Sequence, residues 1–148
     1  MYPSTYRYAK AYQEASTVTA SPGQVILLLY DGILKSLELA KTGFRLEDPA
    51  ERNMTISNSL NKALNIIREL NRVLDFERGG ELAVTLSRLY DYFERQIQKS
   101  NITKSPSGID DVIGQLSEIR EAWSQMLQNR GRQIDVSELG DKLCGLRA

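Results

Sequence analysis

The chain has 148 residues, 19 basic and 19 acidic side chains, no histidine and one cysteine, Cys144. Zero net charge gives no electrostatic basis for binding nucleic acid, and the absence of histidine removes the commonest metal ligand and general base. A single cysteine excludes an internal disulfide and a multi-cysteine zinc site, and no apolar run reaches the length of a membrane span. We therefore expect one cytoplasmic domain without metal, cofactor or nucleic-acid partner.

The first twenty residues contain four tyrosines at a spacing near four, which would line up on one side of a short helix. Tyrosine combines a large apolar body with a hydroxyl that tolerates water, so it suits a removable cover over an apolar surface. We expect residues 1–20 to act as a lid on the segment that follows them.

A helix is predicted to begin within TASPGQVILLLYDGILKSL, residues 19–37. Ser21 as the cap, Pro22 at the first helical position and Gln24 at the third match a capping box, in which two side chains satisfy unpaired backbone amides. Residues 25–29 are apolar around the whole helix, whereas a surface helix normally has one apolar stripe. Either they broaden the buried face, or some of them form a docking surface beneath the lid.

Four segments place apolar residues at alternating spacings of three and four, as helices that pack side by side do. They cover residues 26–44, 56–74, 82–97 and 109–127, and LEDPAE (46–51), RGGE (78–81) and SPSG (105–108) separate them. Because these connections are short, consecutive helices should be antiparallel. The prediction is an all-α, up-down-up-down four-helix bundle over residues 21–131, in a single domain of residues 1–131.

The remaining tail, residues 132–148, is weakly amphipathic. It contains two glycines after Gly131 and five apolar aliphatic residues, Ile134, Val136, Leu139, Leu143 and Leu146. Such a tail can dock as a short extra helix or stay mobile, and both alternatives remain open.

Catalysis finds little support in the sequence. The tripeptide Leu-Tyr-Asp occurs twice, at 29–31 and 89–91, and we interpret both copies as packing elements with a bonded hydroxyl and a solvated carboxylate. A carboxylate-metal bundle enzyme would need inward-facing glutamates on several helices and a Glu-x-x-His element. The chain has no histidine, so no catalytic residue is expected.

Several stretches of the chain resemble the flagellar secretion chaperones of the FliS family. They are TASPGQVILLLYDGILKSLELA (19–40), NIIREL (65–70), LDFERGGELAVTLSRLYDYFERQIQKSNI (74–102) and SEIREAW (117–123). The resemblance runs from about residue 12 to about residue 126 and covers the whole predicted bundle. The family also places a tyrosine near Tyr12, so Tyr12, together with Tyr8, is the expected lid residue.

The resemblance implies a chaperone without enzymatic activity. It would hold the disordered C-terminal segment of flagellin in the bacterial cytoplasm and prevent polymerisation until the type III export apparatus takes the subunit. The apolar residues at spacings of three and four form the seam of each helix and are expected to fill the core. Candidate anchors for this client are residues expected beside these seams, namely Leu27, Leu64, Tyr92 and Trp123. The alternative is a structural or regulatory bundle that self-associates without a flagellin client, and the sequence leaves monomer and dimer open.

Overall fold

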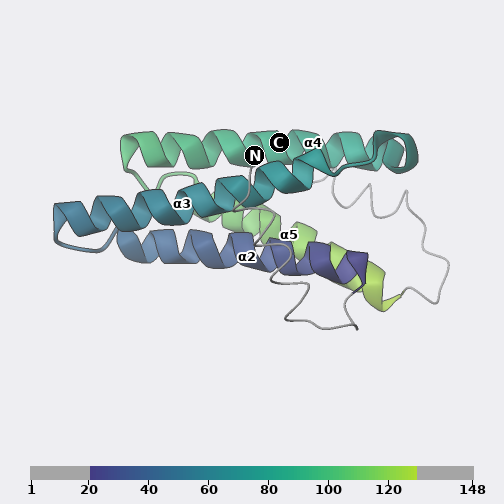
Figure 1. Ribbon diagram of the computed structural model, residues 1–148, viewed down its shortest axis with the longest axis horizontal. Helices are drawn as coiled ribbons and strands as arrows, with labels where there is room; N and C mark the ends of the chain where they lie inside the picture. The colour runs from purple at the N-terminus through teal and green to yellow at the C-terminus, as the bar shows by residue number, and fades with distance from the viewer. Residues whose placement is uncertain (1–20, 130–148) are drawn as a thin grey trace.

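The computed structural model describes residues 21–129, and the residues on either side lie outside it. The described part consists of four helices without strands, namely α2 (Pro22–Gly43), α3 (Pro49–Arg72), α4 (Phe76–Thr103) and α5 (Ile109–Gln128). Successive helices run in opposite directions, as the colour gradient in Figure 1 shows. The predicted all-α four-helix bundle is confirmed, whereas the lid residues Tyr8 and Tyr12 and the tail 132–148 fall outside the described residues.

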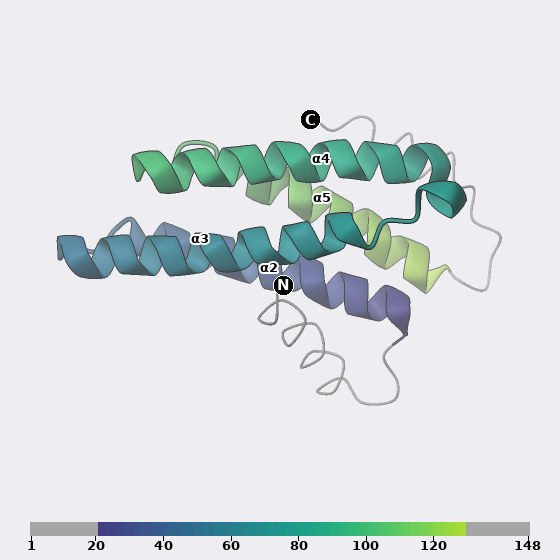
Figure 2. The same ribbon diagram turned by 45° about the horizontal axis from the view of Figure 1, so that its top comes forward.

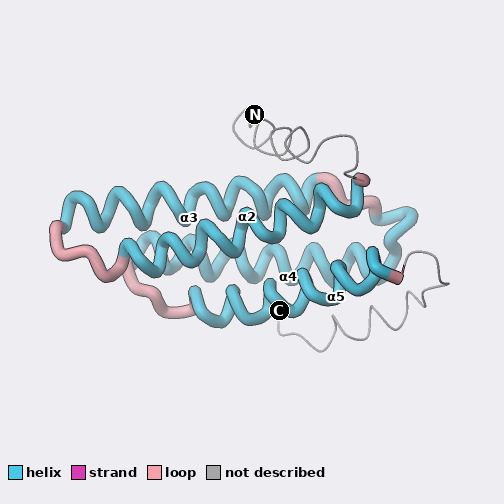
Figure 3. The backbone as a smooth tube through the Cα atoms, turned by 90° about the horizontal axis from the view of Figure 1, so that it is seen from below, coloured by secondary structure: helices cyan, strands magenta, loops and turns pink. Residues whose placement is uncertain are grey.

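The helices form a closed ring of four neighbours. Helix α2 packs against α3 and α5, and α4 packs against the same two helices from the opposite corner. Figure 3 shows α2 and α3 together on one side, with α4 and α5 on the other. Each helix therefore buries one broad face in a shared core and leaves the opposite face exposed.

Helix α2 begins with the predicted capping box. The Ser21 hydroxyl accepts a hydrogen bond from the Gln24 amide at 3.2 Å, and the Gln24 side chain accepts one from the Ser21 amide at 2.9 Å. Pro22 occupies the first turn, where its missing N–H leaves no helical hydrogen bond unmade. This cap fixes the residue at which the chain enters the bundle.

The break between α3 and α4 lies earlier than the sequence predicted. We expected it at RGGE, 78–81, but α3 ends at Arg72 and α4 already begins at Phe76. The Asp75 side chain explains the difference, because it accepts hydrogen bonds at 3.1 Å from the amides of Glu77 and Arg78 and so caps a new helix. Gly80 then interrupts α4 with φ 52° and ψ −127°, and Figure 2 shows the first turn at an angle to the rest.

The core is apolar and contains side chains from all four helices. Tyr30, Tyr90 and Phe93 are its largest fully buried members, and aliphatic residues at the predicted seam positions surround them. Full burial of each such side chain contributes roughly 1.5–3 kcal/mol relative to exposure. The seams of the sequence thus identify the core correctly along most of the bundle's length.

Candidate partner-binding site

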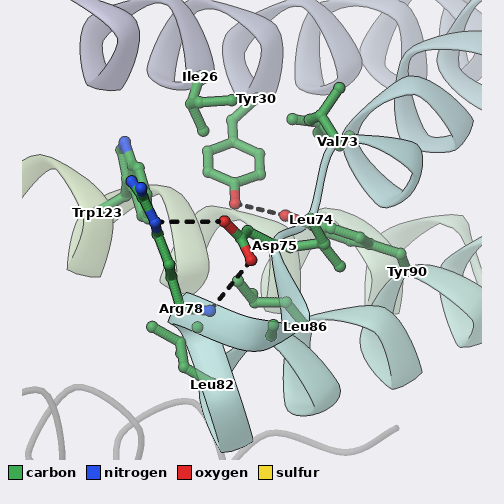
Figure 4. Close-up of a pocket in the computed structure, with 13 residues that line it drawn as sticks. Ile26, Tyr30, Val73, Leu74, Asp75, Arg78, Leu82, Leu86, Tyr90 and Trp123 are labelled. Carbon is green, nitrogen blue, oxygen red and sulfur yellow. Dashed lines mark hydrogen bonds and ion pairs between the residues drawn. The ribbon is translucent and has the colours of Figure 1, made fainter.

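An apolar pocket of about 330 Å³ opens at one end of the bundle, where α2 and α4 begin and α3 and α5 end. The helices and the α3–α4 connection supply its wall (Figure 4). Aliphatic side chains dominate the lining, which includes Ile26, Leu70, Val73, Leu74, Leu82, Ala83 and Leu86. The volume lies at the lower end of the range for ligand pockets, and such a lining favours apolar side chains of a partner.

Two buried tyrosines from different helices also line the pocket. The hydroxyls of Tyr30 on α2 and Tyr90 on α4 lie 2.6 Å apart, and one donates a hydrogen bond to the other. Figure 4 shows them meeting among the residues that line the pocket. Desolvation by burial raises the pKa of Tyr30 to about 12, and it raises the pKa of Tyr90 well above its ordinary value. Both hydroxyls are therefore neutral near pH 7 and act as a fixed polar contact within apolar surroundings.

Trp123, the only tryptophan of the chain, lines the pocket from α5. Its ring stands edge-to-face to Tyr30, with centroids 6.4 Å apart and an angle of 83° between the planes. The indole Nε1 donates a hydrogen bond of 2.9 Å to the carbonyl of Gly23 in the first turn of α2. This bond fixes the indole orientation and joins the last helix of the bundle to the first.

Gly23 also lets α2 and α5 approach closely at this point. A Cβ atom at residue 23 would lie 2.5 Å from Cδ2 of Leu127, a separation that requires the leucine to move. The pocket wall formed by α5 therefore depends on a glycine at the start of α2.

Polar groups of the pocket lie at its rim, in the first turn of α4. Asp75 caps that helix, and the Arg78 guanidinium lies 3.8 Å from its carboxylate. The Arg78 side chain is 92% exposed, so this ion pair contributes little to stability. Val73, which lines the pocket, and Phe76, the first residue of α4, have about half of their surfaces exposed, 54% and 51%. The rim thus offers apolar contact area and one exposed cation to a partner.

The two Leu-Tyr-Asp tripeptides provide bonds between helices. Their tyrosines pair with each other, which confirms the expectation of a bonded hydroxyl at a helix crossing. Asp31 accepts a hydrogen bond of 2.7 Å from Arg120 on α5, and this bond raises the pKa of the guanidinium. Asp91 accepts one of 3.0 Å from Asn71 on α3. Each carboxylate therefore ties its helix to a neighbour, which the sequence pattern alone did not reveal.

Of the four predicted anchors, Trp123 alone lines the pocket. Leu64 is 4% exposed and belongs to the core, so its expected place beside the core is wrong. It shares the inner face of α3 with Leu60 and Ile67, because the buried stripe of that helix is wider than the seam. Leu27 is partly exposed on α2, and the hydroxyl of partly exposed Tyr92 donates a hydrogen bond of 2.6 Å to Asp111.

Most residues that line the pocket were not predicted from the sequence, because they have the same three-four spacing as the residues of the core. Leu70, Leu74, Leu82 and Leu86 all follow the three-four rhythm, which predicts burial but cannot show where the helices diverge and leave a gap. One available signal was the short LDFERGG stretch, which places an acidic cap between two apolar seams. A cap at that place indicates a turn at the bundle end and therefore a rim.

The described residues contain neither a candidate metal site nor a candidate membrane span. Nowhere between residues 21 and 129 do three or more acidic or cysteine side chains gather so that they could hold a metal ion. Over that same range, none of the helices combines the length and hydropathy that crossing a bilayer requires. The lining of the pocket is predominantly apolar, and the hydroxyl pair and the indole N–H already make hydrogen bonds within the bundle, so the lining suits apolar contact with a partner.

Comparison with known proteins assigns the chain to a family. The family model described as "Flagellar protein FliS" matches residues 4–130, which include the whole described bundle. The chain belongs to the FliS family.

Relatives within the FliS family come from distant bacteria. The Flagellar secretion chaperone FliS of Bacillus subtilis is 37% identical over 119 residues, which are 80% of this chain and 85% of the relative. The protein of the same name from Salmonella typhimurium is 38% identical over 120 residues, with 80% and 86% covered. The Flagellar secretion chaperone FliSB of Pseudomonas aeruginosa is 35% identical over 117 residues, with 79% and 90% covered. FliS is a family of chaperones and not of enzymes.

Proposed function

We propose that this member of the FliS family is a cytoplasmic export chaperone that binds the disordered C-terminal segment of flagellin. It keeps the subunit from polymerising and delivers it to components of the flagellar export apparatus. Family membership supports the chaperone role, and the observation that carries the binding mode is the apolar pocket with Trp123 on its wall. A pocket lined by aliphatic and aromatic side chains suits apolar anchors of a client segment.

The mechanism is physical and requires no chemical step. A disordered segment loses conformational entropy when it becomes ordered on the bundle, so its affinity depends on a few well-buried anchors and a long weak contact area. The 330 Å³ pocket can hold such an anchor against Tyr30, Leu82 and Trp123. Its occupation hides apolar client surface that would otherwise drive assembly of flagellin subunits.

The N-terminal segment, residues 1–20, serves in this proposal as a lid that competes with the client. Deletion of residues 1–18 should raise the affinity for a flagellin C-terminal peptide and increase self-association, because apolar surface on α2 becomes free. Loss of peptide binding without loss of the bundle would instead make the segment part of the client site. Tyr8 and Tyr12 are the residues whose replacement by alanine should reproduce the effect of the deletion.

Self-association without a flagellin client is the alternative, and the half-exposed apolar side chains of Val73 and Phe76 favour it. Light scattering of the full chain, alone and with a flagellin C-terminal peptide, separates the two functions. A stable one-to-one complex supports the chaperone, whereas a concentration-dependent oligomer that ignores the peptide contradicts it.

A matched pair of variants tests whether the pocket is the binding site. Val73→Asn changes a half-exposed pocket residue, and Ile102→Asn makes the same apolar-to-amide change at an 83% exposed residue near the other end of α4. The first should weaken peptide binding by about 1–3 kcal/mol, and the second should leave it unchanged. Calorimetric titration measures both, with Trp123 fluorescence as an independent signal from the pocket wall. Equal affinities of the two variants would place the client elsewhere.

A further inference from the structure

The first turn of α4 and its cap form a separate piece of the pocket wall. Residues 75–79, which we call the flap, contribute Asp75, Arg78 and Gly79 to the lining. Gly80 follows with φ 52° and ψ −127°, a backbone conformation that residues with side chains rarely adopt. Figure 2 shows the flap at an angle to the rest of α4. One side of the pocket is therefore joined to the long helix through a glycine pivot.

The shape of the flap is held by bonds within the flap itself. The Asp75 carboxylate accepts hydrogen bonds from the amides of Glu77 and Arg78, and it pairs with the Arg78 guanidinium. The Gly79 amide donates a hydrogen bond of 2.7 Å to the Asp75 carbonyl. Rotation of the flap as a unit leaves all of these bonds intact.

The contact between the flap and the rest of α4 involves small groups. A Cβ atom at Gly79 would lie 2.8 Å from the Cβ of Ala83, so the backbone of the flap rests directly on a methyl group. The side chains of Phe76 and Arg78 are 51% and 92% exposed. Because apolar stabilisation scales with buried area, moving the flap away from α4 costs much less than separating two helices of the bundle.

The short connection from α3 imposes the bend. Asn71 near the end of α3 is hydrogen-bonded to Ser87 and Asp91, which places the end of α3 beside residues 87–91 of α4. In a straight α4, residues 76 and 87 would be about 16 Å apart along the axis. The four Cα steps from residue 72 to residue 76 reach only about 14 Å, and part of that length is needed to cross between the helices. The flap is thus a tethered segment that can swing but cannot straighten while α3 is intact.

We propose that the flap swings about Gly80 and Val73, so that the pocket alternates between the observed narrow form and a wider form that admits a bulky apolar side chain. The observed volume of about 330 Å³ lies at the lower end of the range for ligand pockets, and outward movement of the flap enlarges it. The swing itself does not rest on the proposed function, whereas selection of the wider form by a client does. The flap belongs to α4, and the proposed N-terminal lid covers apolar surface on α2, so the two devices are compatible.

Distances between two nitroxide labels, measured by pulsed electron paramagnetic resonance on the full chain, test the swing. Cys144→Ser removes the native thiol, and Lys99→Cys places a reference label on the exposed face of α4. The second label is attached at Phe76→Cys before the pivot or, as the matched control, at Val84→Cys after it, both at exposed apolar residues. The 76–99 distribution should have two maxima, one of them at the distance of the observed bend, and the 84–99 distribution should have one. Equal widths of the two distributions would overturn the proposal.

Replacement of the pivot provides a second test. In the labelled 76–99 protein, Gly80→Ala should reduce the population at the distance of the observed bend, because alanine rarely adopts φ 52°. Gly114→Ala, the same change where an added Cβ meets nothing within 4 Å, should leave the populations unchanged. A Gly80→Ala protein that is less stable but keeps the original distance distribution would show a fixed bend and no swing.

A saturating flagellin C-terminal peptide separates this inference from the proposed function. If the client inserts an anchor beneath the flap, the peptide should shift the 76–99 distribution toward the second maximum and leave the 84–99 distribution unchanged. Two maxima whose populations ignore bound peptide would support the swing and would contradict the proposed client site. A single 76–99 maximum with and without peptide would refute the swing, and the Val73→Asn and Ile102→Asn pair would then still decide whether the client uses the pocket.

Discussion

The hydroxyl pair of Tyr30 and Tyr90 tests how much one buried polar contact contributes to stability. Replacement of Tyr90 by phenylalanine leaves the Tyr30 hydroxyl buried without its observed partner, so we expect a loss of about 1–3 kcal/mol in the free energy of unfolding. The double replacement of both tyrosines by phenylalanine should cost less than the sum of the two single ones, because no orphan remains. Urea unfolding of the three variants measures this coupling, and strict additivity would contradict it.

The same tyrosines predict a loss of stability at alkaline pH. Burial raises the pKa of Tyr30 from 10 to about 12, so between these values the unfolded chain has released a proton that the folded chain still holds. Stability is therefore complete below pH 10 and falls as pH rises toward 12, by up to about 1.4 kcal/mol per pH unit for each such tyrosine. Urea unfolding at pH 9, 10 and 11 measures the slope. The double phenylalanine variant serves as the control and should show a smaller decline.

At the scale of the helices, replacement of two glycines by alanine should have opposite effects on the unfolding free energy. A Cβ at Gly43 would lie 3.0 Å from the Thr55 side chain and 3.3 Å from the Ile56 backbone nitrogen, so α2 and α3 would have to separate. A Cβ at Gly114, within α5, would meet nothing within 4 Å. Gly43→Ala should therefore lower the unfolding free energy by about 1–3 kcal/mol, and Gly114→Ala should raise it by about 0.5–1 kcal/mol.

Thermal unfolding of the two alanine variants, followed by circular dichroism, measures both effects. The two changes are chemically identical, so the comparison isolates the contact between α2 and α3 from the general preference of helices for alanine. Stabilisation by both substitutions would show that α2 and α3 can separate slightly at no cost.

Much of the fold could be predicted from the sequence because local signals and core spacing agree. The capping box at Ser21 and the Asp48 cap before Pro49 act within four residues, and both stand where the sequence indicates a helix start. The RGGE break is present at Gly80, which leaves helical geometry with φ 52° and ψ −127°, but it is not where α3 ends, because the cap at Asp75 starts another helical turn before the glycines. Leu64 failed for a different reason, since periodicity gives the direction of a side chain but not the width of the buried face.

Much less of the candidate site than of the fold could be predicted from the sequence, because the site exists only where four helix ends meet. The pairs Tyr30–Tyr90 and Trp123–Gly23 join residues 60 and 100 positions apart, and no local pattern records such separations. Trp123 was selected because a large aromatic residue near a helix end is a good candidate anchor; it lines the pocket, and its role as an anchor stays a prediction. The remaining lining follows the same apolar rhythm as the core.

For the whole molecule, the balance of charge predicts how binding responds to salt. The net charge is zero and the pocket is predominantly aliphatic, so long-range attraction contributes little to client capture. Raising the salt concentration from 0.05 to 0.5 M, values chosen to span about a threefold change in screening length, should alter the peptide affinity by less than about threefold. Calorimetric titration at the two concentrations measures this, and a collapse in affinity would point to an electrostatic surface instead.

The bond from the Trp123 indole to the Gly23 carbonyl has a consequence for chain connectivity. Because it joins the last turns of α5 to the first turn of α2, the described bundle begins and ends at one place, and Leu127 lies against Gly23 there. A circular permutant that joins residue 129 to residue 21 through a short linker, and opens the chain at the 105–108 connection, should therefore retain the bundle. Equally, a client segment fused behind α5 would start beside the pocket, so that chaperone and cargo could be studied as one polypeptide at fixed stoichiometry.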